Sequence, residues 1–159
     1  MKNKKYPIIV ILDNVRSAYN VGAIFRTCDA AGIIKLYLCG ITPYPPHNKI
    51  PKTALGATES VSWKKCSTTE EAIEEFKKEE KGRVLAVEKV QGSVNFWEFN
   101  YTFPLALIFG HEVTGISKTA LKLADGIIEI PMFGEKESLN VETACGIVVY
   151  EIIRKFLTS

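Results

Sequence analysis

No part of the 159-residue sequence is apolar for long enough to cross a membrane as a helix, which needs about 20 apolar residues. The longest apolar runs, residues 7–12 and 104–110, are much shorter. The amino terminus is basic, but a strand-like segment follows it where a secretory signal would have its cleavage site. We therefore expect a cytoplasmic protein. A content of 47% hydrophobic and 24% charged residues is typical of a globular protein, and the length predicts one domain, residues 1–159.

Clustered metal ligands are also lacking. The four cysteines are widely spaced and form no CxxC pair, and the sequence has two histidines, His47 and His111. A zinc site needs ligands that lie close together, so we expect no metal and no disulfide. Cys39 and Cys145 lie in apolar segments, which predicts that both are buried thiols.

Three common glycine motifs are missing as well. No GxGxxG follows the first predicted strand, which leaves a Rossmann dinucleotide site without support. No GxxxxGK[ST] is present, which excludes a P-loop, and no GxSxG is present, which argues against a hydrolase nucleophile elbow. A ligand of this protein must therefore be bound in another way.

The sequence does contain a regular alternation of apolar strand-like segments and helical segments. This alternation predicts an α/β fold with a mostly parallel sheet and helices on both faces. The last predicted helix is well specified, because its apolar residues recur at helical spacing and Asn140 can cap it. The expected strands are 7–13, 33–40, 60–63, 83–89, 104–110 and 126–131, and the expected helices are 20–31, one near 52–57, 68–79, 117–123 and 140–157.

Positive charge is concentrated in residues 47–65, which contain four lysines and one acid, Glu59. Such a stretch can be a solvated surface or the binding face for a polyanion. Three of these lysines are candidate contacts to RNA phosphate, although each could also be a plain surface residue: Lys49, Lys52 and Lys64.

Three segments place polar residues and glycine after predicted strands, where ligands bind in an open α/β sheet. Their polar residues are Asn20 and Arg26 in the first, Glu112 in the second, and Ser138 with Asn140 in the third. Taken singly, most of these residues could be helix caps or turn residues. Arg26 is harder to explain, because it lies among small and apolar residues such as Gly22, which are expected to leave room for a ligand, and because a buried guanidinium needs a partner. That partner could be a carboxylate, carbonyl groups or a phosphate. Glu112 could supply the carboxylate, or Asn20 could orient the side chain.

In this order and spacing, the segments resemble the SpoU (TrmH) family of the SPOUT superfamily, RNA ribose 2′-O-methyltransferases that use S-adenosylmethionine. The three family motifs correspond to NVGAIFR at 20–26, FGHEVTG at 109–115, and IPM at 130–132 followed by SLNV at 138–141. The resemblance covers essentially the whole chain. The sequence departs from the family at Glu142, where a small residue is usual.

This resemblance implies a deep trefoil knot at the C-terminal end of the fold, whose loops form the cofactor pocket. It also implies a homodimer in which the first and last helices supply much of the contact and the active site lies near the interface. No appended RNA-binding domain is expected. By motif position, the residues expected to bind S-adenosylmethionine are Val87, Gly110, Ile130, Ser138, Leu139, Asn140 and Ala144.

The implied reaction is attack of a ribose 2′-hydroxyl on the cofactor methyl group, in tRNA more readily than in rRNA. Arg26 would be the central catalytic residue. Family schemes often make it the general base, but a guanidinium stays protonated near neutral pH, so we expect it to clamp a phosphate and steady the forming alkoxide. Asn20 would orient Arg26 or the ribose, and Glu112 would hold Arg26 or the loop. Ser138 and Asn140 would position cofactor and ribose.

Two other functions compete with this prediction. The same fold could be a module that binds RNA or cofactor without turnover, although all the polar motif residues are present. An unrelated hydrolase could use His111 with Ser117, but the sequence offers no triad acid and no nucleophile elbow.

Overall fold

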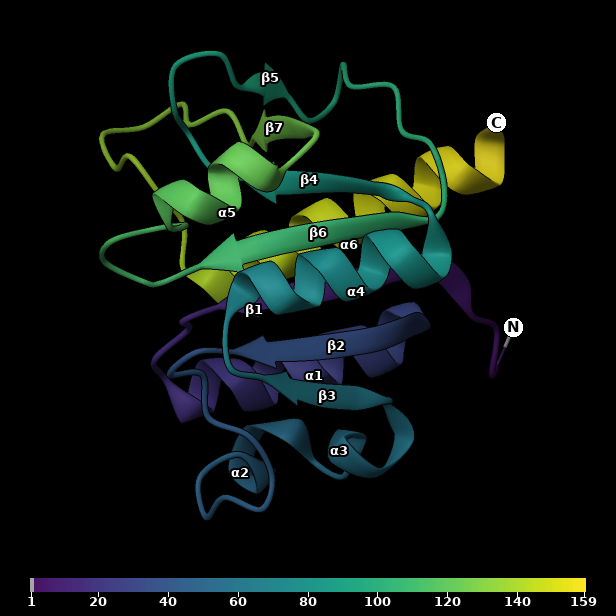
Figure 1. The fold of residues 1–159 in the computed structure, drawn as a ribbon, viewed down its shortest axis with the longest axis vertical. Coiled ribbons are helices and arrows are strands. Elements are labelled where there is room, and N and C mark those ends of the chain that lie inside the picture. The colour runs from purple at the N-terminus through teal and green to yellow at the C-terminus, as the bar shows by residue number, and fades with distance from the viewer. Residues whose placement is uncertain (1) are drawn as a thin grey trace.

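The computed structural model describes residues 2–159, and its central feature is a seven-stranded sheet in the order β3-β2-β1-β6-β4-β7-β5 (Figure 1). Every strand pairing is parallel, which confirms the predicted α/β class with a parallel sheet. The strands are β1 (Tyr6–Asp13), β2 (Ile33–Cys39), β3 (Trp63–Cys66), β4 (Arg83–Val87), β5 (Val94–Asn95), β6 (Leu105–Gly110) and β7 (Gly126–Glu129).

Helices cover both faces of this sheet. In Figure 1, α4 and α5 lie in front of the sheet, α1 and α6 lie behind it, and α2 and α3 lie at its lower end. Strand side chains alternate between two apolar cores, because successive residues of a strand point to opposite faces. The helices are α1 (Ala18–Ala31), α2 (Pro51–Ala54), α3 (Ala57–Ser60), α4 (Thr69–Glu80), α5 (Lys118–Leu123) and α6 (Val141–Thr158).

The helix caps explain where the two helices nearest the site begin. Ser17 caps α1 by accepting a hydrogen bond from Asn20 N, so α1 starts two residues earlier than predicted. Asn140 caps α6 as predicted, because its side chain accepts a hydrogen bond from Glu142 N. Cys39 and Cys145 are buried, as predicted.

One strand prediction was wrong. Residues 60–63 were expected to be a strand, but the structure has helix α3 up to Ser60 and begins β3 at Trp63. Strand β3 pairs with β2 from Leu36↔Trp63 onward, so the partner strand rather than the local pattern sets its start. The segment 91–103, expected to be irregular, contains the two-residue strand β5.

The strand register brings the motif segments together. Asp13 at the end of β1 lies beside Gly110 at the end of β6, and β4 pairs with β6 on the other side. The segments that follow β1 and β6 therefore leave the sheet at the same edge. No helix within residues 2–159 is long and apolar enough to span a membrane.

Candidate active site

One chain of hydrogen bonds joins the three motif segments. Asn20 Nδ2 donates to Glu112 Oε2 over 3.1 Å, and Asn20 Oδ1 accepts from Asn140 Nδ2 over 3.5 Å. The first bond links α1 to the loop after β6, and the second links α1 to the start of α6. Residues that are 92 and 120 positions apart in the sequence therefore meet at one point.

Glu112 is hydrogen-bonded to the start of α1 and not to the side chain of Arg26. Its carboxylate accepts hydrogen bonds of 2.9 Å from the backbone N–H groups of Arg16 and Ser17, besides the bond from Asn20. Burial alone would raise the pKa of this carboxyl, but these N–H donors outweigh it and lower the pKa. Glu112 is therefore an ionised anchor for the loop, one of the two roles that the sequence left open.

Beside this chain of hydrogen bonds lies a hollow of about 790 Å³, which we call the first hollow. It is lined by the ends of β4 and β6, the loop after β6 and the segment before α6. All seven residues that the sequence predicted for cofactor binding line it: Val87, Gly110, Ile130, Ser138, Leu139, Asn140 and Ala144.

Sequence reasoning missed the other side of this hollow. Glu88, Lys89 and Val90, directly after β4, also line it. Glu88 Oε2 accepts a hydrogen bond of 3.0 Å from Ile116 N, so it ties the end of β4 to the loop after β6. The only available signal was that these residues follow a buried strand, as ligand-binding residues often do in such sheets.

Gly110 and Gly115 shape the loop between β6 and α5. This loop folds back on itself, with hydrogen bonds between the backbones of His111 and Gly115. A side chain at Gly110 would collide with the backbone of Gly115 and Ile116, and Gly115 has a φ of 73°. Glycine is thus required at position 110 because the loop after β6 folds closely against it, and not because a ligand does.

Segment 131–139 precedes α6, and four of its residues line one wall of the first hollow: Met132, Glu137, Ser138 and Leu139. Within residues 2–159, no hydrogen bond involves any backbone or side-chain group of this segment. The N–H and C=O groups of these four residues are therefore available to a ligand, beside apolar side chains such as Ile130 and Leu139. An apolar slot edged with free backbone groups suits a flat heterocycle such as adenine.

The model of the SpoU rRNA methylase family matches residues 7–150, nearly the whole chain. The chain belongs to this family. The sequence resemblance is thereby confirmed.

Relatives named for RNA methylation are similar over most of the chain. A tRNA (guanosine(18)-2′-O)-methyltransferase of Aquifex aeolicus is 37% identical over 98% of this chain and 72% of its own length. Among solved structures, the A. aeolicus TrmH/SpoU tRNA modifying enzyme has a TM-score of 0.85 and 34% identity, over 97% of this chain and 77% of that one. An AdoMet-bound rRNA methyltransferase from Sinorhizobium meliloti has a TM-score of 0.87 and 29% identity, over 98% of this chain and 59% of that one.

The structure corrects our reading of Arg26 in this SpoU protein. Its side chain is exposed on α1 and lines neither the first hollow nor the second hollow described below. The guanidinium is therefore not buried, and Glu112, one of the partners left open by the sequence, binds Arg16 N, Ser17 N and Asn20 instead. The small residue Gly22 does not make room for a ligand either, because a side chain there would collide with Thr53 and Ile50, where α2 packs on α1.

The three candidate lysines of this SpoU protein lie in different surroundings. Lys49 lines the second hollow, and Lys52 is exposed on α2. Lys64 Nζ forms an ion pair with Glu75 over 2.8 Å, which lowers the pKa of that carboxyl. Lys64 thus already has an anionic partner on the protein.

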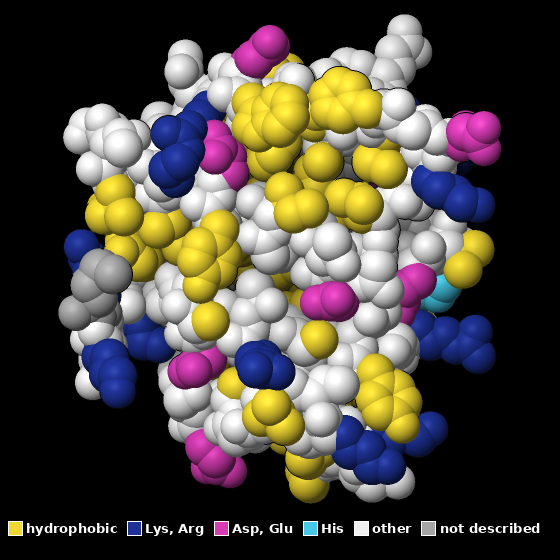
Figure 2. All heavy atoms as spheres, turned by 180° about the vertical axis from the view of Figure 1, so that it is seen from behind, with side chains coloured by type: hydrophobic (Ala, Val, Ile, Leu, Met, Phe, Trp, Pro, Cys, Tyr) yellow, Lys and Arg dark blue, Asp and Glu magenta, His cyan; other side chains and the backbone are white. Residues whose placement is uncertain are grey.

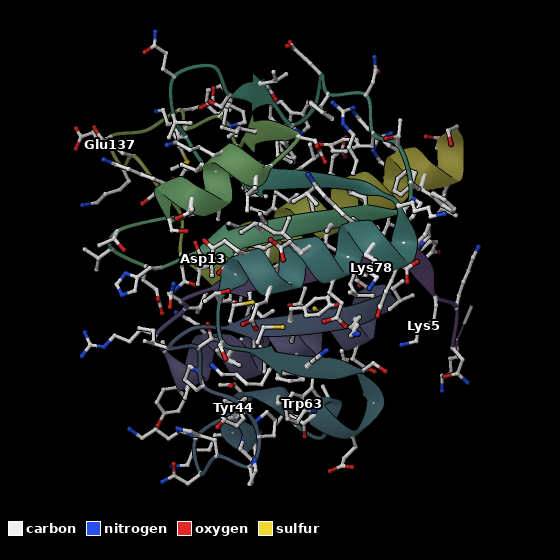
Figure 3. The ribbon with its side chains drawn as sticks, in the orientation of Figure 1. Lys5, Asp13, Tyr44, Trp63, Lys78 and Glu137 are labelled. Carbon is white, nitrogen blue, oxygen red and sulfur yellow. The ribbon has the colours of Figure 1, made fainter. Side chains whose placement is uncertain are left out.

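Asp13, another functional-looking residue that the sequence did not single out, is 1% exposed at the carboxyl end of β1 (Figure 3). Its carboxylate accepts hydrogen bonds from Thr69 Oγ1 (2.6 Å), Ser117 N (2.7 Å) and Asn14 Nδ2 (2.9 Å). Asp13 thereby fixes the starts of α4 and α5 to the sheet. The local sequence does not show whether an aspartate at the end of a strand anchors helices, as Asp13 does, or binds a ligand.

The hydrolase alternative gains no support from the structure. His111 Nδ1 accepts hydrogen bonds from the backbone N–H groups of Val113 and Thr114, while Ser117 Oγ accepts one from Ala120 N and caps α5. Among the described residues no hydrogen bond joins His111 to Ser117.

Glu142, the departure from the family pattern, lies half-buried in the first turn of α6, where its side chain accepts a hydrogen bond from Thr143.

Proposed function

We propose that this protein transfers a methyl group from S-adenosylmethionine to a ribose 2′-hydroxyl of RNA. Membership of the SpoU family and the names of the relatives support this reaction. The structural observation that carries it is the hydrogen-bonded chain of Glu112, Asn20 and Asn140 beside the first hollow. A tRNA substrate has more support than rRNA, because the A. aeolicus relative named for tRNA is the more similar one, at 37% against 29% identity.

The first hollow has the chemistry to hold this cofactor. The free backbone groups of Met132 and residues 137–139 would bind the polar edge of adenine, and Val87, Ile130 and Leu139 would contact its faces. Gly110, Ser138 and Ala144 line the remaining wall. The bound cofactor supplies an electrophilic methyl group. The chain's own residues bind and orient the reactants, and orientation contributes much of the acceleration in an in-line displacement.

The polar residues then take separate roles. Asn20, held from both sides, would orient the ribose, and Asn140 with Ser138 would position it against the cofactor. Glu112 is a positioning residue that acts through Asn20. Because an arginine side chain stays protonated in proteins, Arg26 would clamp an RNA phosphate and steady the forming alkoxide. Lys52 is a candidate for a more distant phosphate contact, for which Lys64 is less suited because it pairs with Glu75.

Arg26 reaches a reaction centre in this scheme only if a second copy supplies it. We propose a homodimer formed through the face of α1 and α6, which would bring the exposed Arg26 of one protomer toward the hollow of its partner. Figure 2 views this face, where hydrophobic side chains gather. The exposed apolar residues on or beside α6 include Ile147 and Tyr150, which is 52% exposed. An apolar stripe of this kind is typical of an interaction surface.

The dimer can be tested by its mass in solution. Ile147→Asp combined with Tyr150→Asp should yield a monomer in sedimentation analysis, because two charges would be buried in the interface. Ile41→Asp introduces the same charge at an exposed apolar residue outside this face and should leave the dimer intact. A wild-type monomer at micromolar concentration would refute the proposal.

We also propose the trefoil knot at the C-terminal end of the fold. Membership of the SpoU family, from which the knot is expected, supports it. The chain between α5 and α6 also crosses from the front core to the rear core, which is compatible with a knot there.

The activity is tested by transfer of radiolabelled methyl from S-adenosylmethionine to RNA from cells that lack the protein, whose target sites are unmethylated. Separate small-RNA and ribosomal-RNA fractions should distinguish tRNA from rRNA. We expect incorporation that Arg26→Ala abolishes and that Lys78→Ala, an exposed cation on α4, preserves. Intact cofactor binding without incorporation into any fraction would instead favour the binding module.

A further inference from the structure

A second hollow, of about 530 Å³, lies next to the first. His111, Glu112 and Val113 line both, so the loop after β6 is their common wall. The far side of the second hollow is formed by the start of α1 and by the loop after β2, including His47 and Lys49. Its volume lies within the range of roughly 300–1,000 Å³ usual for small-molecule sites.

The second hollow carries two cations that have no partner in the part of the chain that the structure describes. Arg16 and Lys49 both line it, and within residues 2–159 neither the guanidinium nor the ammonium group forms a hydrogen bond or an ion pair. Glu112 is the acid in its lining, but both of its oxygens already accept N–H hydrogen bonds. The lining thus carries two unpaired cations against one hydrogen-bonded carboxylate, and this net positive charge suits a phosphate.

The two histidines of this hollow are held in one orientation. His47 Nδ1 accepts a hydrogen bond from Lys49 N over 3.1 Å, and His111 Nδ1 accepts from Val113 N and Thr114 N. In a neutral imidazole one nitrogen accepts and the other donates, so each ring keeps its Nε2–H as a donor. Tyr19, also in the lining and 46% exposed, adds a flat aromatic face.

We propose that the second hollow binds one nucleotide of the RNA, adjacent to the nucleotide that is methylated. Arg16 and Lys49 bind its phosphate, while the rings of Tyr19 and His47 stack on its base. Phosphate contacts and base stacking are the two interactions by which proteins hold single-stranded RNA. This inference rests on the proposed function, because it takes the substrate to be RNA.

The position of the hollow supports this assignment. Asn20 lines the second hollow, Asn140 lines the first, and the two side chains are hydrogen-bonded to each other. A nucleotide in the second hollow therefore leaves the neighbouring ribose at the boundary, next to Asn20 and Asn140. That is where a 2′-hydroxyl must lie to meet a methyl group held in the first hollow.

The direct test is calorimetric titration with cytidine 5′-monophosphate and with inorganic phosphate, with S-adenosylhomocysteine present to fill the first hollow and again without it. Both variants Arg16→Gln and Lys49→Gln should weaken cytidine monophosphate binding by about tenfold, because each removes a charge-assisted hydrogen bond. Inorganic phosphate should bind more weakly than the nucleotide because it cannot stack. Lys78→Gln, the same charge change on α4, should have no effect.

A kinetic test separates this inference from the proposed function. Arg16→Gln and Lys49→Gln should raise KM for RNA by about tenfold while the affinity for S-adenosylhomocysteine stays unchanged, which also shows that both variants fold. Normal nucleotide affinity and normal KM in both variants would overturn the inference and leave the methyltransferase proposal intact. A wild-type protein that binds the nucleotide but methylates no RNA would refute the proposed function and leave only the nucleotide-binding part of this inference standing.

Discussion

Replacement of Glu112 by glutamine tests whether its charge, and not only its shape, holds the start of α1. The carboxylate accepts three hydrogen bonds, from Arg16 N, Ser17 N and Asn20 Nδ2. Each charge-assisted bond contributes about 1.5–3 kcal/mol when buried, and much less at an exposed site. Glutamine keeps one accepting oxygen but turns an NH₂ group toward backbone donors. Because Glu112 is exposed, we expect Glu112→Gln to lower the free energy of unfolding by about 1–2 kcal/mol at pH 7.

The pH dependence of stability tests whether the charge of Glu112 causes this loss. The pKa of Glu112 is lowered in the folded protein, so its contribution is complete above the unfolded carboxyl pKa of about 4.3 and is lost as the pH falls through the lower folded value. Urea denaturation should therefore show a gap between wild type and Glu112→Gln that is full at pH 7 and closes below about pH 4. Glu98→Gln, at an exposed acid outside the site, is the control. A gap of equal size at pH 7 and pH 3 would refute the role of the charge.

Three further predictions follow from the same geometry. Gly110→Ala should destabilise the fold by about 2 kcal/mol or more in urea denaturation, because its methyl group meets the backbone of Gly115 and Ile116, whereas Gly134→Ala, with open space around it, should be near neutral. Asp13→Asn should cost about 2–4 kcal/mol in the same assay, since an NH₂ group would face the donors of Thr69 or Ser117, and a loss below about 0.5 kcal/mol would contradict this account. Asn140→Ala and Asn140→Ser should both lower methyl transfer, because each removes the amide that positions the ribose, and alanine should lower it more because serine retains a cap for α6; normal transfer in Asn140→Ser would contradict the positioning role.

Elements and site residues that depend on local pattern were predictable from the sequence. The apolar spacing of α6 and its cap at Asn140 are local properties, and both were predicted. The three motifs were recognised because their residue order is specific, and the strand alternation then placed them at one edge of the sheet. By contrast, the start of β3 was misjudged because it is set by pairing with β2.

Features that depend on long-range contacts could not be predicted. The bond between Asn20 and Asn140 joins residues 120 positions apart, and no periodicity encodes it. Gly22 was ambiguous for the same reason, since a small residue beside Arg26 is equally compatible with a ligand and with the packing of α2. The second hollow combines residues of α1, the loop after β2 and the loop after β6, so it becomes visible only in the folded chain.

The shared wall between the two hollows ties the affinities of the two ligands to each other. It is a single tight turn, closed by Gly115 and anchored through Glu112 to the start of α1. If cofactor on one side of this turn changes its position, the affinity for RNA on the other side changes by some factor. Linkage then requires that RNA change the affinity for cofactor by the same factor. A substitution in residues 111–113 that changes how far this turn moves would therefore change the effect of cofactor on RNA and the effect of RNA on cofactor by the same factor.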